Sequence, residues 1–101
     1  MSKIPERMSA FKRTHDEWYG NYKIANDARV SALVEVSLIK MPKYKDSPIG
    51  WRVCVWGNDD FGMERDYNDT DKDSAVAMFH QVISWDFVNI GQLKTNGFVH
   101  A

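Results

Sequence analysis

The chain has 101 residues, of which 44% are hydrophobic and 27% charged, and its formal net charge is −1. This composition excludes an intrinsically disordered chain, and the length predicts a single domain over residues 1–101, with short mobile tails at 1–3 and 95–101. The charge is uneven, because residues 1–45 hold nine Lys or Arg and five Asp or Glu, whereas residues 46–101 hold four and nine. The sequence therefore permits two surfaces of opposite sign, and the net charge alone favours no class of partner.

Cysteine content and hydropathy predict the compartment. Cys54 is the only cysteine, which excludes a disulfide within the chain and a zinc site made of four cysteines. The opening residues MSKIPERMSAFKR lack the apolar core of a secretory signal, and no run approaches the ~18 apolar residues of a membrane span. We expect a protein of the reducing cytoplasm, which would be the host cytoplasm if the chain is viral.

The first predicted element is a helix over residues 4–19. Apolar and aromatic residues recur at steps of three and four, as one helical face requires. This face consists of Ile4, Met8, Phe11, His15, Trp18 and Tyr22. Pro5 suits the first helical turn, and Gly20 with Asn21 supplies a stop signal.

Three strands are predicted next. Between residues 28 and 41 the period changes to two, with Val34 and Val36 on one face and Glu35 and Ser37 on the other. Residues 51–56 and 63–67 are two further strands, and the turn-forming residues between them predict a hairpin. The pattern does not say which face of the strand 51–56 is buried.

The last predicted element is a helix over residues 72–88, apolar over more than half of its circumference. One face holds Val76, Phe79, His80, Ile83, Phe87 and Ile90. Thr70 and Asp73 have the spacing of a capping box, and Gly91 is expected to end or interrupt the helix.

These elements predict an α+β fold, a two-layer sandwich in the order α-β-β-β-α. A three-stranded antiparallel meander would be packed by the C-terminal helix, with the N-terminal helix beside it or at a sheet edge.

Acidic residues at alternate positions resemble the start of a calcium-binding loop, through Asp69, Asp71 and Asp73. The sixth and twelfth positions of such a loop would be Ser74 and His80, so the turn glycine and the bidentate glutamate are both missing. Charge at the start of a helix explains the spacing better.

Candidate catalytic or metal residues are few. His15 and His80 would meet if the two helices packed together, and Arg52 on the same strand face could activate the Cys54 thiol. Core packing explains these residues more simply, and no phosphate-binding glycine loop, nucleophile elbow or H-E-x-x-H motif is present. We therefore predict a protein that is not an enzyme, with no catalytic residue, cofactor or metal.

The strongest functional pattern is a mixture of acidic and aromatic residues after the second strand. Seven Asp or Glu fall between positions 59 and 73, offset only by Arg65 and Lys72. Aromatic anchors among charges are typical of protein-binding surfaces, although a solvated hairpin tip and helix start would show the same charges. The predicted partner-binding residues are Trp56, Asp59, Asp60, Phe61, Glu64, Asp66, Tyr67, Asp69 and Asp71.

A basic loop offers an alternative. Lysines and a tyrosine between the first two strands, together with the cations of the first predicted helix, could contact nucleic-acid phosphates. The alternative contact residues are Lys40, Lys43, Tyr44 and Lys45. A solvated loop is the competing interpretation.

The layout resembles that of small accessory proteins of tailed bacteriophages, which bind and inhibit host factors; inhibitors of a host dGTPase are one example. The likeness lies in Met8-Ser-Ala-Phe-Lys12, in Arg52-Val-Cys-Val55 and in the acid-led segment from Asp71 to Leu93. It covers most of the chain as a layout and shares no motif, so it transfers no functional residue.

The resemblance and the acidic surface together predict a non-enzymatic protein-binding module. It would be a phage-encoded inhibitor or modulator of a host enzyme or defence factor, acting by occlusion. A nucleic-acid-binding accessory protein and a small structural or self-associating subunit remain alternatives, and a homo-oligomer is compatible with the exposed aromatic residues that four Trp and four Tyr imply.

Overall fold

The computed structural model describes residues 18–25, 33–43, 45–57 and 61–100. Within these residues, five strands form one antiparallel sheet whose spatial order follows the chain order. The strands are β1 (Trp18–Ile24), β2 (Leu33–Lys40), β3 (Ile49–Trp56), β4 (Gly62–Asn68) and β5 (Val99–His100). A 3-10 turn η1 (Asp69–Asp71) leads into α2 (Lys72–Ser84), and α3 (Ile90–Thr95) follows.

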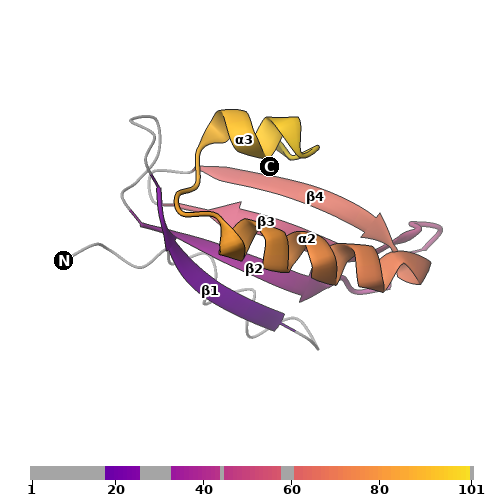
Figure 1. Ribbon diagram of the computed structural model, residues 1–101. Helices are drawn as coiled ribbons and strands as arrows, with labels where there is room; N and C mark the ends of the chain where they lie inside the picture. Colours follow the sequence, from indigo (N-terminus) through magenta and orange to yellow (C-terminus); the bar gives the residue numbers. More distant parts are fainter. Residues whose placement is uncertain (1–17, 26–32, 44, 58–60, 101) are drawn as a thin grey trace.

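The helix α2 covers one face of the sheet. It packs on β2, β3 and β4, while α3 lies farther along, beside β4 (Figure 1). The sheet supplies alternate apolar residues to this layer, among them Val36 and Val55, which are cross-strand partners. Phe79 and Val82 of α2 and Leu93 of α3 complete the core. Burial of each large side chain contributes about 1.5–3 kcal/mol to stability.

The opposite face of the sheet is also buried, but it is mixed in chemistry. Ile39, Cys54 and Trp56 form a small second apolar cluster there. Glu35 and Ser37 of β2 lie on the same face, opposite Trp56 and Cys54, and are 1% and 0% exposed. The predicted alternation of β2 is therefore confirmed, yet its polar face is not solvated.

Gly50 of β3 lets the start of the η1 turn approach this strand closely. A Cβ atom at this position would collide with the side chain and the Cα of Asp69. The register of β3 against β4 shifts between Ile49 and Trp51, directly at this contact. A glycine is required here by the close approach of two backbone segments.

The predicted order α-β-β-β-α is wrong. The sheet has five strands, and no helix precedes β1 among the residues described. Residues 18 and 19, assigned to the end of the first predicted helix, begin β1 instead, and residues 4–17 lie outside the described part. The confusion has a physical origin, because Trp18 and Tyr22 are four residues apart. That spacing places two side chains on one face of a helix and equally on one face of a strand.

The final helix is also shorter than predicted. It ends at Ser84 rather than at residue 88, and Gly91 lies within the separate helix α3. His80 and Phe87, both assigned to its apolar face, are exposed. The predicted capping box is absent, since Asp71 is the N-cap residue and no side chain caps the helix.

Several sequence expectations are confirmed. The fold is α+β, β2 to β4 fall within or close to the predicted ranges, and the undecided face of β3 is settled in part. Trp51, Val53 and Val55 face α2, while Cys54 and Trp56 are buried on the other side. No helix in the described residues is long and apolar enough to cross a membrane.

Candidate functional site

Two acidic residues of the hairpin, Glu64 and Asp66, are held in an ion-pair cluster with Arg52. Arg52 is paired in register with Asp66, and Cys54 with Glu64, so all four side chains share the face away from α2. The Arg52 Nε lies 2.6 Å from Asp66 Oδ1 and 2.8 Å from Glu64 Oε2, and Nη2 donates to Asp66 Oδ2 at 3.1 Å. Burial raises the pKa of Glu64, the Arg52 charge opposes this, and the Asp66 charge adds to it. One guanidinium therefore neutralises much of the local negative charge.

The predicted acidic and basic sites meet at Asp69. Lys43 Nζ donates to Asp69 Oδ2 at 2.9 Å, and Lys40 Nζ lies 3.5 Å from Oδ1. The hydrogen bond from Lys43 is the main cause that lowers the pKa of Asp69. Lys40 and Lys72 also place their ammonium groups 5.0 and 4.8 Å from the ring centre of Trp51. The predicted acidic surface and the predicted basic loop are therefore in contact with each other, through Asp69 and the two lysines.

The remaining predicted residues are dispersed. Trp56 is buried on the face of the sheet opposite α2, whereas Phe61 and Tyr67 are half-buried against the main core. Of the remaining partner-binding residues that the structure describes, only Asp71 at the start of α2 is exposed. Lys45 is exposed in the loop before β3. The predicted residues outside the described part are Tyr44, Asp59 and Asp60. Their binding roles stay predictions.

The residues considered for catalysis are not assembled into a site. Burial raises the pKa of Cys54 to about 12, which keeps the thiol protonated. His80 is exposed and lies edge-on to Phe79, with ring centres 5.4 Å apart. His15 lies outside the described residues. Within the described ranges, no group of three or more His, Cys, Asp and Glu could hold a metal ion.

An exposed apolar strip runs along the end of β1. It consists of Tyr22, Ile24 and Phe87, whose exposed fractions are 43%, 58% and 46%. The last residue after β1, Ala25, forms a parallel bridge with Val88, and Val88 N donates to Ile24 O at 3.0 Å. Side chains alternate between the two faces of an extended chain. Ile24 and Phe87 each precede a bridged residue, so both point to the face opposite Ala25 and Val88. Ile24 and Phe87 are therefore neighbours on the surface.

A buried carboxylate positions one ring of this strip. Tyr22 is the cross-strand partner of Glu35. Burial raises the pKa of Tyr22, and both the charge of Glu35 and a hydrogen bond with it act in the same direction. The Tyr22 side chain is thus influenced by a buried carboxylate of the sheet, while 43% of the residue stays exposed.

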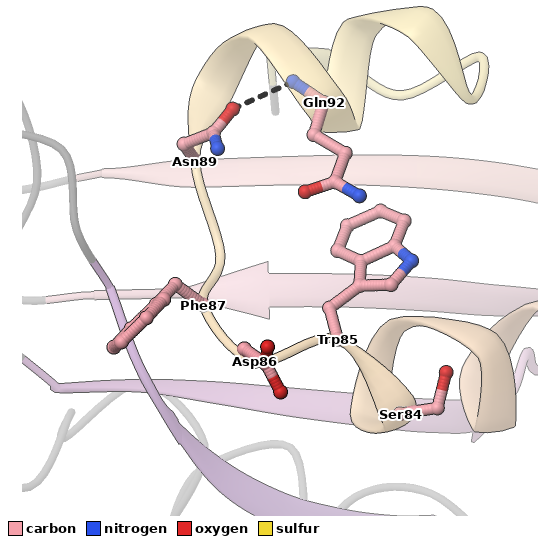
Figure 2. Close-up of a pocket in the computed structure, with 6 residues that line it drawn as sticks. All are labelled: Ser84, Trp85, Asp86, Phe87, Asn89 and Gln92. Atoms are coloured by element: carbon pink, nitrogen blue, oxygen red, sulfur yellow. Dashed lines mark hydrogen bonds between the residues drawn. The ribbon is translucent and has the colours of Figure 1, made fainter.

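Next to the strip, an open cleft of about 440 Å³ lies at the turn between α2 and α3 (Figure 2). We call it the turn cleft. Its lining consists of Ser84, Trp85, Asp86, Phe87, Asn89 and Gln92. Figure 2 shows Trp85 and Gln92 together on one side, Phe87 on the other and Asp86 between the two aromatic residues. Trp85 is half-buried, whereas Asp86 and Phe87 are exposed.

Hydrogen bonds define the two ends of the turn. Trp85 N donates to Val82 O at 3.2 Å, which closes α2, and Asn89 Oδ1 accepts from Gln92 N at 2.8 Å, which starts α3. Ser84 Oγ donates to Gln81 O at 2.6 Å. The cleft is therefore framed by two capped helix ends and by the bridge from Val88 to β1.

Neither the strip nor the turn cleft was predicted from the sequence. A usable signal was present, because Asn89 followed three residues later by Gln92 is typical of a helix start. A helix beginning there would have required a break before it, which brings Trp85, Asp86 and Phe87 to the surface. The strand character of residues 18–24 had no comparable signal.

Comparisons with known proteins add no family. A scan against protein-family models, a search of curated proteins and a search of solved structures each found no match. The resemblance to phage accessory proteins stays a prediction.

Proposed function

We propose that the chain is a non-enzymatic protein-binding module that docks on its partner through the apolar strip of Tyr22, Ile24 and Phe87. The observation that carries this proposal is the exposure of three large apolar side chains on two segments that are joined by the bridge between Ala25 and Val88. Contiguous exposed apolar surface on a small domain is typical of interaction sites.

The position of β1 supports the same surface. Among the described residues, β1 pairs along its length only with β2, and it therefore lies at the edge of the sheet. An edge strand presents backbone N–H and C=O groups that a partner segment can use, and exposed aromatic side chains add specificity. The strip combines both features.

The acidic hairpin is a weaker docking surface than its composition suggests. Glu64 and Asp66 are paired with Arg52, and Asp69 is paired with two lysines. A partner would have to displace these contacts before it gained an ion pair of its own. Lys40 and Lys43 are engaged in the same way, which disfavours the nucleic-acid alternative.

The biological setting is proposed from the sequence. The layout resemblance favours a phage-encoded inhibitor or modulator that occludes a functional surface of a host enzyme or defence factor in the host cytoplasm. Occlusion requires only a stable complex over the partner's site, so it needs no catalytic group in this chain.

Affinity capture with matched variants tests the proposal. Tagged wild-type protein is incubated with nuclease-treated bacterial lysate, and stoichiometric partners are identified by mass spectrometry. We expect Ile24→Ser and Phe87→Ser each to lose the partner, because each removes apolar area at the centre of the contact. Val99→Ser is the control, since Val99 is 61% exposed on β5 and lies outside the strip.

Three other results would contradict the proposal. Retention of the partner by both strip variants would overturn the docking surface. Capture of protein from a parallel untreated lysate, with nothing captured after nuclease treatment, would favour nucleic acid. A wild-type dimer that Ile24→Ser converts to a monomer, with no other protein bound, would identify a self-associating subunit instead.

A further inference from the structure

We propose that the turn cleft binds the cationic end of an arginine or lysine side chain of the partner protein. This inference rests on the proposed function, because Phe87 belongs both to the apolar strip and to the lining of the cleft. It adds the chemistry of the partner, namely a basic residue next to an apolar contact.

The charge of the cleft selects a cation. Among the described residues that line the cleft, Asp86 is the only charged one. In the part of the chain that the structure describes, Asp86 forms no ion pair, in contrast to Glu64, Asp66 and Asp69. Its carboxylate can therefore accept a charge-assisted hydrogen bond without losing an existing one.

The aromatic residues suit the same ligand. Trp85 and Phe87 come from either side of Asp86 in the chain, and both residues line the cleft, Trp85 beside Gln92 and Phe87 on the opposite side (Figure 2). A guanidinium or ammonium group is attracted to an aromatic face, and tryptophan is the strongest of the aromatic side chains in this respect. The methylene stem of arginine or lysine can pack on apolar atoms while its charge reaches the carboxylate.

The polar wall supplies further acceptors. The side-chain oxygen Oδ1 of Asn89 accepts a hydrogen bond from the backbone N–H of Gln92, which holds the Asn89 side chain in place. The side chain of Gln92 points along the Trp85 indole (Figure 2) and brings a carboxamide oxygen to the cleft. The Ser84 hydroxyl donates to Gln81 O, so its oxygen still has acceptor capacity. A guanidinium has five donors and no acceptor, and this lining matches it.

Other ligand classes fit less well. An anion would meet Asp86, and no Lys, Arg or His among the described lining residues offsets that charge. An apolar ligand would cover a carboxylate and two carboxamides without pairing them, which is costly. A neutral sugar could use the aromatic rings and amides, but it would gain little from the negative charge. The charge dependence of binding therefore separates a cation from a sugar.

Titration with small probes tests the cleft without the partner. N-acetyl-arginine amide is added to the ¹⁵N-labelled full chain, and the indole N–H signal of Trp85 is followed, assigned through Trp85→Phe. N-acetyl-citrulline amide, nearly the same shape without the charge, is the matched probe, and N-acetylglucosamine represents sugars. We expect saturable shifts with the arginine amide alone, weakened at high salt.

Substitution of the carboxylate provides the second measurement. Asp86→Asn keeps the shape of the side chain and removes its charge, and we expect at least about a tenfold loss of affinity for the arginine amide. Asp73→Asn is the control, because Asp73 is an exposed acid on α2 outside the cleft. Equal shifts with the citrulline amide, binding of the sugar only, or unchanged affinity in Asp86→Asn would each overturn the inference.

The partner complex distinguishes this inference from the proposed function. Capture that is lost with Ile24→Ser but unchanged with Asp86→Asn would overturn the cation site and leave the docking strip standing. Arginine binding that depends on Asp86, in a chain whose strip variants retain the partner, would leave the cation site in place and overturn the strip.

Discussion

The β3–β4 hairpin and the α2–α3 turn both combine acidic and aromatic residues, yet they use them differently. In the hairpin, Arg52 binds Glu64 and Asp66, and the aromatic Trp56 is buried. In the turn, Asp86 has no ion pair among the described residues, and Phe87 is exposed. The hairpin has more charge, but its described acids Glu64 and Asp66 are paired internally with Arg52. The comparison teaches that binding capacity depends on which charges remain unpaired, which composition does not reveal.

At neutral pH, the largest expected effect lies in the hairpin. Arg52→Met should lower the free energy of unfolding by about 1–3 kcal/mol, because two partly buried carboxylates lose their shared cation. Urea denaturation at neutral pH measures the change. Arg52→Lys is the control and should cost less, since it keeps the charge and loses the two-bond contact with Asp66. A methionine variant as stable as the wild type would show that the cluster is solvated and structurally unimportant.

The stability of the fold at alkaline pH should depend on Cys54, which lies on the same sheet face as Arg52. The folded thiol has a pKa raised by burial from 9.0 to about 12, so the folded state disfavours the thiolate. The resulting stability is complete below about pH 9 and declines as the pH rises toward 12, by up to about 1.4 kcal/mol per pH unit. Urea denaturation of wild type and Cys54→Ala across this range isolates the contribution. Rapid alkylation of the native thiol at pH 8 would contradict the assignment.

At the turn, the cap of α3 has an intermediate effect. Asn89→Ala should lower stability by about 1 kcal/mol, because Gln92 N loses its side-chain acceptor. Asn89→Asp should retain most of the stability. Thermal unfolding gives the values, and amide exchange within residues 90–95 shows whether the loss is local. An alanine variant with unchanged exchange would mean that the cap does not define the end of the cleft.

Removal of the unpaired charge should be nearly neutral for folding. Asp86→Asn is expected to change stability by less than about 0.5 kcal/mol, because no ion pair is lost within the described structure. Thermal unfolding beside Arg52→Met gives the contrast directly. A cost similar to that of the arginine variant would erase the difference between the two regions.

The smallest effect concerns the contact between the two predicted surfaces. Lys43→Ala should raise the pKa of Asp69 toward its ordinary value, since the Lys43 hydrogen bond is the main cause of the depression. Because the pKa of Asp69 is depressed in the folded state, its carboxylate stabilises the fold at pH values above the ordinary Asp pKa, and this stabilisation is lost as the pH falls. The variant lacks most of this contribution, so it should lose less stability on acidification. An NMR titration of the Asp69 carboxyl measures the change. An unaltered pKa would show that the loop lysine is not bound in solution.

Sequence patterns predicted the central hairpin well and the edges poorly. Val34, Val36 and Leu38 alternate over a single strand face, and the apolar face of α2 includes Phe79 in both prediction and structure. The strand β1 was hidden because Trp18 and Tyr22 satisfy helical and strand spacing alike. The two-residue strand β5 is too short for any periodicity, and its pairing with β4 depends on tertiary packing.

The candidate site was less predictable than the fold. Acid counts drew attention to Asp69, whose lysine partners lie 26 and 29 positions earlier in the chain. Such long-range pairing leaves no local signature. The surface strip likewise depends on a contact between distant segments, because the hydrogen bond from Val88 to Ile24 brings Phe87 next to the end of β1.

The hydrogen bond from Val88 to Ile24 spans most of the described chain, whereas successive strands of the sheet pair with close neighbours. Contacts that close long loops are expected to form late in folding. The strip would then be absent from partly folded chains, and partner binding would select molecules that have completed folding. Proton exchange at the Val88 amide should be slowed by a bound partner, so that one backbone site reports both maturation and occupancy.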